Sequence, residues 1–183
     1  PAGPNTPVHI LFHGGYWHSQ DKKIFESPAF SFVKNKITYV CVNYPLCPDV
    51  SFSELMLSCR KMMVHLFKNI HDYVDIPASI QVSGHSAGAQ IAVILASTNW
   101  HTEGFRKIPS IHSVLALSGV YDLQPIICLE KNQTIQMNQK EVEQFSPVRF
   151  AEKLNAKLNI VVGENEGAEF IRQSQNLAEC VRY

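Results

Sequence analysis

Five short apolar runs along the chain are typical of buried strands. They are rich in β-branched and aromatic residues, and several of them end at a glycine or a proline. We expect strands over residues 8–12, 37–44, 79–82, 111–117 and 158–162.

Three segments between or after these runs have the spacing of helices. Apolar residues recur at helical spacing from Phe52 to Ile70, and Ser51 with Glu54 predicts a capping box at the start of that helix. Residues 87–96 are apolar on nearly every face, which is typical of a helix buried against a sheet. A third helix is expected over residues 168–181.

Strands that alternate with helices predict a mostly parallel sheet with helices on both faces. In such a sheet the functional site lies at the carboxyl ends of the strands. We expect a single domain over residues 1–183. The polar stretch 124–153 interrupts the alternation and is interpreted as a cap-like excursion that covers a substrate pocket.

Charge and the length of the apolar runs argue against nucleic acid and membranes as partners, and the cysteine content indicates the compartment. The chain has 16 basic and 16 acidic residues in 183, so no charge excess favours nucleic acid, and no apolar run reaches the length of a membrane span. The five cysteines are odd in number and scattered, which favours free thiols in a reducing compartment. A small-molecule partner and a cytoplasmic location are therefore expected.

The sequence Gly84-His85-Ser86-Ala87-Gly88 follows a predicted strand and precedes a predicted helix. A GxSxG motif in this context is typical of a nucleophile elbow, in which a tight turn exposes the serine hydroxyl beside a helix N-terminus. We therefore interpret Ser86 as the nucleophile of an acyl-transfer site in an α/β-hydrolase fold. The alternative is a glycine-rich turn that only packs the helix on the strand.

The segment His13-Gly14-Gly15-Tyr16-Trp17 also follows a predicted strand. Backbone N–H groups at Gly14 or Gly15, with the N–H of Ala87, are candidates for the oxyanion hole that acyl transfer needs. Tyr16 and Trp17 either pack in the core or line an aromatic pocket. His9, His13 and His18 fit no common zinc spacing, so no metal is expected and His13 is interpreted as structural.

The acid of a catalytic triad should follow a late strand. Glu166 lies in the loop after residues 158–162, and Glu164 is its nearest rival. Asp122 follows an earlier strand and is also readable as a turn residue or helix cap. Either glutamate is alternatively a solvated loop charge.

No histidine follows Glu166, whereas the triad order of this fold is serine, acid, histidine. His101 and His112 precede the acid, and His85 is interpreted as a packing residue or a pocket residue beside the serine. We expect that the sequence is truncated at both ends, so that the final strand and the histidine loop are missing after Tyr183. The unpaired sheet edge would then favour aggregation of this segment.

Four motifs together resemble the kynurenine formamidase (arylformamidase) family: HGGYW at 13–17, GHSAGA at 84–89, SGVYDL at 118–123 and EFIRQS at 169–174. The resemblance implies cytosolic hydrolysis of N-formyl-L-kynurenine to L-kynurenine and formate in tryptophan catabolism. It also implies an acyl-enzyme on Ser86, an oxyanion loop at Gly14 and Gly15, and no cofactor. Glu166 stands where the family normally has aspartate, and the family's histidine has no counterpart.

Two other functions remain open. A carboxylesterase of the hormone-sensitive-lipase-like kind shares the HGG and GxSxG motifs, and its chemistry would act on an aromatic ester in place of a formamide. A catalytically inactive pseudo-hydrolase is the other alternative, and the missing histidine and the glutamate at position 166 motivate it.

Overall fold

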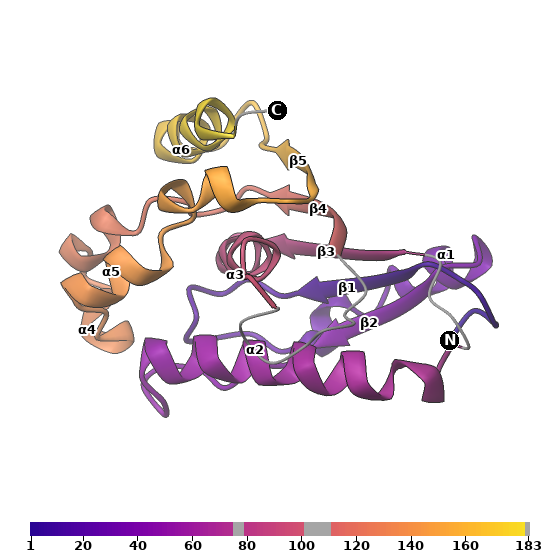
Figure 1. Ribbon diagram of the computed structural model, residues 1–183. Helices are drawn as coiled ribbons and strands as arrows, with labels where there is room; N and C mark the ends of the chain where they lie inside the picture. Colours follow the sequence, from indigo (N-terminus) through magenta and orange to yellow (C-terminus); the bar gives the residue numbers. More distant parts are fainter. Residues whose placement is uncertain (75–78, 101–110, 182–183) are drawn as a thin grey trace.

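The protein forms one parallel sheet of five strands, seen nearly edge-on in the computed structural model (Figure 1). The structure describes residues 1–74, 79–100 and 111–181. The strand order is β2-β1-β3-β4-β5, and each neighbouring pair is parallel. The strands are β1 (Val8–Phe12), β2 (Thr38–Val42), β3 (Ile80–His85), β4 (Ile111–Leu117) and β5 (Lys157–Val161). The predicted parallel sheet is confirmed, with differences of a few residues at strand ends.

The strand order reverses direction at β1. From β1 the chain crosses to β2 on one side, and it then returns to place β3, β4 and β5 on the other side. In open parallel sheets, the point of reversal opens a crevice outside the carboxyl ends of the strands. The loops that follow β1 and β3 meet at this point, and they carry the two glycine-containing motifs.

The two long helices after β2 and β3 form where their patterns predict them. Helix α2 (Phe52–Asn69) begins at the predicted capping box, in which Ser51 and Glu54 each bond to the other's backbone N–H. Helix α3 (Ala87–Ala96) is buried over its first nine residues, from Ala87 to Leu95. It packs mainly on β3 and β4, which explains why its sequence has no polar face.

Helices cover both faces of the sheet. Phe32 of helix α1 (Ala29–Lys34) packs on the ring of His9 in β1, with 4.4 Å between ring centroids. The alternate residues Val8, Ile10 and Phe12 belong to the apolar core that also contains the buried residues of α2 and α3. Because successive side chains of a strand point to opposite faces, α1 and this core lie on different faces.

The excursion 124–153 contains two short α-helices and several 3-10 turns. Their bounds are η3 (Gln124–Cys128), α4 (Asn132–Ile135), α5 (Gln139–Phe145), η4 (Pro147–Arg149) and η5 (Ala151–Lys153). In Figure 1 helices α4 and α5 lie beyond the carboxyl ends of the strands. The remaining helical elements are η1 (Lys22–Phe25), η2 (Ile70–Asp72) and α6 (Ala168–Cys180), and α6 lies beside β5. Within the described ranges, no helix is both long and apolar enough to cross a bilayer.

Candidate active site

Ser86 is the single residue between the end of β3 and the start of α3. Its backbone has φ 54° and ψ −118°, a conformation that non-glycine residues rarely adopt. The Ser86 N–H donates to the carbonyl oxygen of Leu117 over 2.9 Å, and its carbonyl accepts from the Ala89 N–H. Local strain of this kind persists where the surrounding structure holds it, and it is concentrated at functional sites. This geometry favours the interpretation of the turn as a nucleophile elbow.

Two glycines flank Ser86 because the turn leaves no room for side chains. A Cβ on Gly88 would overlap the carbonyl oxygen of Phe12, and a Cβ on Gly84 would overlap the backbone of Gly88. Helix α3 therefore lies directly against the carboxyl end of β1. This close approach brings the loop after β1 to the N-terminus of the helix that carries Ser86.

The loop after β1 contacts the elbow through Gly14. A Cβ built on Gly14 would lie 3.3 Å from the Cβ of Ser86 and 2.9 Å from the carbonyl oxygen of His85. Gly15, Tyr16 and Trp17 have positive φ angles of 107°, 49° and 58°, so the chain reverses tightly here. The N–H of Ala87 lies in the first turn of α3, where N–H groups lack acceptors within the helix. Gly14 and Ala87 thus both lie next to Ser86, which keeps their N–H groups as candidate oxyanion donors.

His13 and His9 are buried and bonded to neighbouring groups. The His13 ring has its Nδ1 2.8 Å from the carbonyl oxygen of Gly14 and stacks on Tyr44. His9 Nε2 lies 2.7 Å from the hydroxyl of Ser83. Burial lowers the pKa of both histidines, which favours the neutral imidazole. The described part of the chain contains no group of three His, Cys, Asp or Glu residues arranged to hold a metal ion.

The structure separates Tyr16 from Trp17. Trp17 is fully buried, packs edge-on against Phe52 and donates from Nε1 to Gln90 Oε1 over 3.1 Å. Its ring is therefore part of the core and is not among the residues that line the pocket described below. Gln90 also donates to the carbonyl oxygen of Phe145 over 2.9 Å. Sequence reasoning missed Gln90, although a glutamine within the otherwise apolar run 87–96 is a visible signal.

Glu166 is turned toward the end of β4. Its Oε1 accepts from the Ser118 hydroxyl over 2.5 Å and from the Gly163 N–H over 2.9 Å. The Ser118 hydroxyl is the main cause of a lowered Glu166 pKa, followed by the Gly163 N–H, and His85 adds a small contribution in the same direction. Glu164 is exposed and has no hydrogen-bond partner among the described residues. The contacts therefore favour Glu166 over Glu164 as the triad acid, and Ser118 is a partner that sequence reasoning did not identify.

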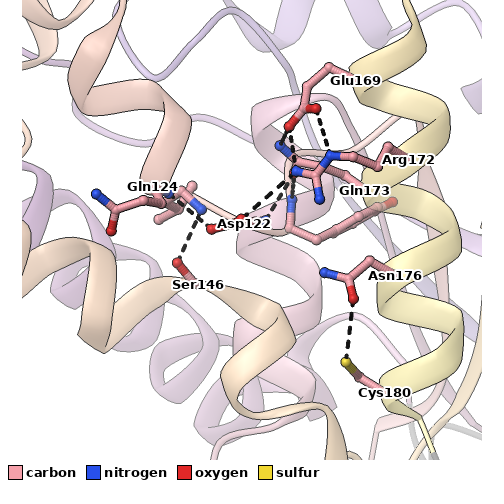
Figure 2. A network of polar contacts seen from close by, with 10 residues as sticks. Asp122, Gln124, Ser146, Glu169, Arg172, Gln173, Asn176 and Cys180 are labelled. Carbon is pink, nitrogen blue, oxygen red and sulfur yellow. Dashed lines mark hydrogen bonds and ion pairs between the residues drawn. The ribbon is translucent and has the colours of Figure 1, made fainter.

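Asp122 has a local structural role in a polar network between the segment after β4 and helix α6 (Figure 2). Its carboxylate accepts from the Gln124 N–H over 3.0 Å and lies 3.8 Å from Arg172. Gln173 accepts from the backbone N–H groups of Tyr121 and Asp122, and it donates to Glu169. Asp122 thus holds the turn that leads into η3, in agreement with its alternative interpretation as a turn residue.

Within the described residues, neither Ser86 nor Glu166 has a histidine as a hydrogen-bond partner. His85 is exposed beside the elbow, and His112 is exposed near the start of β4. His101 lies outside the described residues. The described site therefore contains a candidate nucleophile, candidate oxyanion donors and a candidate acid, and no histidine among the described residues bonds to the nucleophile or the acid.

A pocket of about 220 Å³ lies where three segments of this site meet the excursion. Each segment contributes one wall residue close in sequence to a candidate site residue. Tyr16 comes directly after Gly15, Val120 lies two residues after Ser118, and Glu169 lies three residues after Glu166. Further lining residues are Pro125, Ile126, Leu129, Phe170 and Gln173. The walls are mainly apolar and aromatic, which suits a small aromatic molecule.

Comparison with known proteins finds a matching family, sequence relatives and solved structures of this architecture. The BD-FAE family model matches residues 2–181. A kynurenine formamidase of Danio rerio is 30% identical over 179 residues, and the match covers 95% of this chain and 59% of that protein. Esterase LipQ of Mycobacterium tuberculosis is 29% identical over 127 residues, covering 66% of this chain and 30% of that protein.

The solved structure of an arylesterase superimposes with a TM-score of 0.77 at 16% identity, covering 97% of this chain and 64% of that chain. The predicted α/β-hydrolase fold and the predicted resemblance to kynurenine formamidases are both confirmed. The chain spans 59% of the length of the Danio rerio relative, so the sequence compared is shorter than that protein.

Proposed function

The chain belongs to the BD-FAE family, and from this premise we propose that the protein is a serine hydrolase that cleaves small aromatic formamides. The observation that carries the proposal is the position of Ser86, in a strained elbow against Gly14 and at the N-terminus of α3. This position supports nucleophilic attack with stabilisation of the developing oxyanion. The α/β fold alone would not support it, since one fold serves many functions.

In the proposed mechanism the Ser86 hydroxyl attacks the formyl carbon and forms a tetrahedral intermediate. The N–H groups of Ala87 and of Gly14 or Gly15 stabilise its negative oxygen, and loss of one such donor typically costs about 3–4 kcal/mol of barrier. Collapse releases the aromatic amine and leaves a formyl ester on Ser86. Water then attacks this ester and releases formate, which regenerates the serine.

Both steps need a base that takes the serine or water proton and returns it to the leaving group. Glu166 supports this role because its carboxylate remains ionised and can orient an imidazole and stabilise its cation. The residues that the structure describes leave the position of the base unfilled. A protein in which that position stays unfilled would be a pseudo-hydrolase, so activity must be measured on the complete natural protein.

Within this class we propose N-formyl-L-kynurenine as the substrate and L-kynurenine and formate as the products. The similarity to a kynurenine formamidase supports this choice, as does the pocket lined by Tyr16 and Phe170 beside the oxyanion loop. An aromatic ring is flat and apolar, so these walls can bury it. The formyl group is small enough to need no acyl pocket of its own.

The test is hydrolysis of N-formyl-L-kynurenine and of phenyl acetate by the full-length natural protein and its Ser86→Ala variant. We expect turnover of the formamide that falls by at least about a thousandfold in the variant, as in other serine triads. Circular dichroism and a thermal melt of the variant control for folding. Turnover that is unchanged by Ser86→Ala would refute the proposal that Ser86 is the nucleophile.

An aromatic ester is the second candidate substrate, and the similarity to Esterase LipQ favours it. The same nucleophile and oxyanion donors would serve an ester, whose leaving group departs more readily than an amine. Turnover of phenyl acetate without turnover of any arylformamide would select this alternative.

A further inference from the structure

Tyr44 lies behind the loop of the candidate oxyanion donors and bonds to its backbone. Its hydroxyl donates to the carbonyl oxygen of His13 over 2.7 Å, and its ring stacks on the His13 ring with 4.3 Å between centroids. Both residues are buried. Burial is the main cause that raises the pKa of Tyr44 above its ordinary value, so the phenol keeps its proton and remains a hydrogen-bond donor.

The carbonyl group that Tyr44 holds belongs to the same peptide unit as the N–H of Gly14. A peptide unit is planar, and in the trans form its carbonyl and its N–H point in opposite directions. The bond from Tyr44 therefore fixes the direction of the Gly14 N–H, which points away from the buried tyrosine. A hydrogen bond to the carbonyl also polarises the peptide unit, which makes its N–H a stronger donor.

His13 controls the next peptide unit in the same way. Its Nδ1 lies 2.8 Å from the carbonyl oxygen of Gly14, and since a carbonyl oxygen only accepts, Nδ1 is the donor. This carbonyl shares a peptide unit with the N–H of Gly15, so the direction of that N–H is fixed as well. Neither glycine N–H donates to another residue in the described part of the chain. Both remain free for an oxygen atom bound beside Ser86.

Resting on the proposed function, we propose that Tyr44 and His13 are positioning residues of the oxyanion hole. Through the two carbonyl groups they orient the N–H groups of Gly14 and Gly15 toward the oxygen that becomes negative when Ser86 attacks. Tyr44 acts through the loop and takes no part in the bond-making steps. Its effect should therefore be similar for a formamide and an ester, because both reactions develop the same oxyanion.

The test compares Tyr44→Phe with the wild type of the full-length protein on N-formyl-L-kynurenine and phenyl acetate. The substitution removes only the hydroxyl, and the N–H of Cys47 still holds the loop through its 2.8 Å bond to the Trp17 carbonyl oxygen. We expect kcat to fall roughly tenfold to a hundredfold, which is part of the loss of about 10²–10³ that follows removal of a whole oxyanion donor. KM should stay near the wild-type value, because this interaction strengthens only in the transition state.

Tyr39→Phe is the matched control. The Tyr39 hydroxyl also donates to a backbone carbonyl oxygen over 2.7 Å, but that carbonyl belongs to Phe25 in η1. Thermal melts should show similar losses of stability in the two variants, whereas only Tyr44→Phe should lose activity.

Inhibition by phenylboronic acid is a second readout. Its boron bonds to the Ser86 oxygen, whose proton passes to the base, and the adduct is a tetrahedral anion that resembles the transition state. Its inhibition constant should rise in Tyr44→Phe by about the factor by which kcat falls, and it should not change in Tyr39→Phe.

The inference is overturned if Tyr44→Phe keeps the wild-type kcat and boronate affinity, or if Tyr39→Phe loses as much activity. A rise in KM without a fall in kcat would also overturn it. If Tyr44→Phe does not fold, His13→Phe decides by the same two readouts, since it keeps a ring against Tyr44 but removes the donor to Gly14. Wild-type protein that hydrolyses neither substrate would refute the proposed function itself, and the inference with it.

Discussion

The indole N–H of Trp17 donates to the side-chain oxygen of Gln90 across 3.1 Å, and neither side chain is exposed. Gln90 lies one helical turn after Ser86, and Trp17 lies two residues after Gly15. The bond therefore joins the loop of the candidate oxyanion donors to the helix of the candidate nucleophile. Gln90 also donates to the carbonyl oxygen of Phe145, so the same side chain links the helix to the excursion as well.

We expect Gln90→Leu to lower kcat by roughly tenfold or more with little change in KM. The substitution keeps the side-chain volume but leaves the Trp17 N–H and the Phe145 carbonyl without partners, at a cost of about 1–3 kcal/mol each. The loop, with positive φ at Tyr16 and Trp17, would then relax away from Ser86. Steady-state kinetics and urea unfolding of the same preparation measure the two effects.

The control for this prediction is Ile94→Ala, near the other end of α3. Ile94 is buried, and the truncation should cost about 2–5 kcal/mol of stability. It should leave kcat near the wild-type value because Ile94 lies about two helical turns after Ala87, near the end of α3 that is away from Ser86. If Gln90→Leu and Ile94→Ala lose stability alike and neither changes kcat, Gln90 is a structural residue without a positioning role.

Gly88→Ala should destabilise the protein strongly, because the added methyl group would overlap the carbonyl oxygen of Phe12. Overpacking typically costs about 1–3 kcal/mol, and here the neighbour is backbone that cannot rotate away. Ala-to-Gly substitution at the adjacent Ala89 is the control, with an expected loss of only about 1 kcal/mol from helix propensity. Urea unfolding that shows Gly88→Ala as stable as wild type would contradict the close packing of α3 on β1.

Much of the fold could be predicted because its strands and helices follow simple patterns. The run VHILF reads as a buried strand, and all five of its residues are buried. The capping box at Ser51 and Glu54 fixes the start of α2. Such features are local, since the periodicity of side chains and the needs of a helix N-terminus are set within a few residues.

The contacts that assemble the site are distant in sequence, and the sequence showed only some of them. Glu166 could be chosen from its place after a strand, but its partner Ser118 lies 48 residues earlier. The bond between Trp17 and Gln90 joins residues that are 73 positions apart. From the sequence alone, Trp17 could equally be a core residue or a wall of a pocket. Strand order and loop geometry decide such pairs, and neither can be read from hydrophobic periodicity.

The edge strand β5 is the basis of a prediction about solubility. Val161, its last residue, has 49% of its surface exposed, and an apolar residue on an open edge favours pairing between molecules. We expect residues 1–183 produced alone to self-associate and Val161→Lys to reduce this. Val33→Lys is the matched control, since Val33 is 42% exposed but lies on α1. Light scattering that finds the unmodified segment monodisperse would contradict the prediction.

The bond between Ser118 and Glu166 predicts a pH-dependent stability. The Glu166 pKa is lowered in the folded protein, chiefly by the Ser118 hydroxyl. A carboxyl with a lowered folded pKa contributes stability that is fully present above its ordinary pKa of about 4.3 and is lost as pH falls through the lowered value. Ser118→Ala removes the main cause of the shift, so the pKa of Glu166 should rise toward its ordinary value.

We therefore expect Ser118→Ala to be less stable than wild type at neutral pH, with a difference that shrinks as pH falls below about 4. Urea unfolding at a series of pH values measures the difference. In a Glu166→Gln background, position 166 does not titrate, so the effect of Ser118→Ala should no longer depend on pH. A wild-type difference that stays constant from neutral to acid pH would show that the Ser118 hydroxyl does not control the ionisation of Glu166.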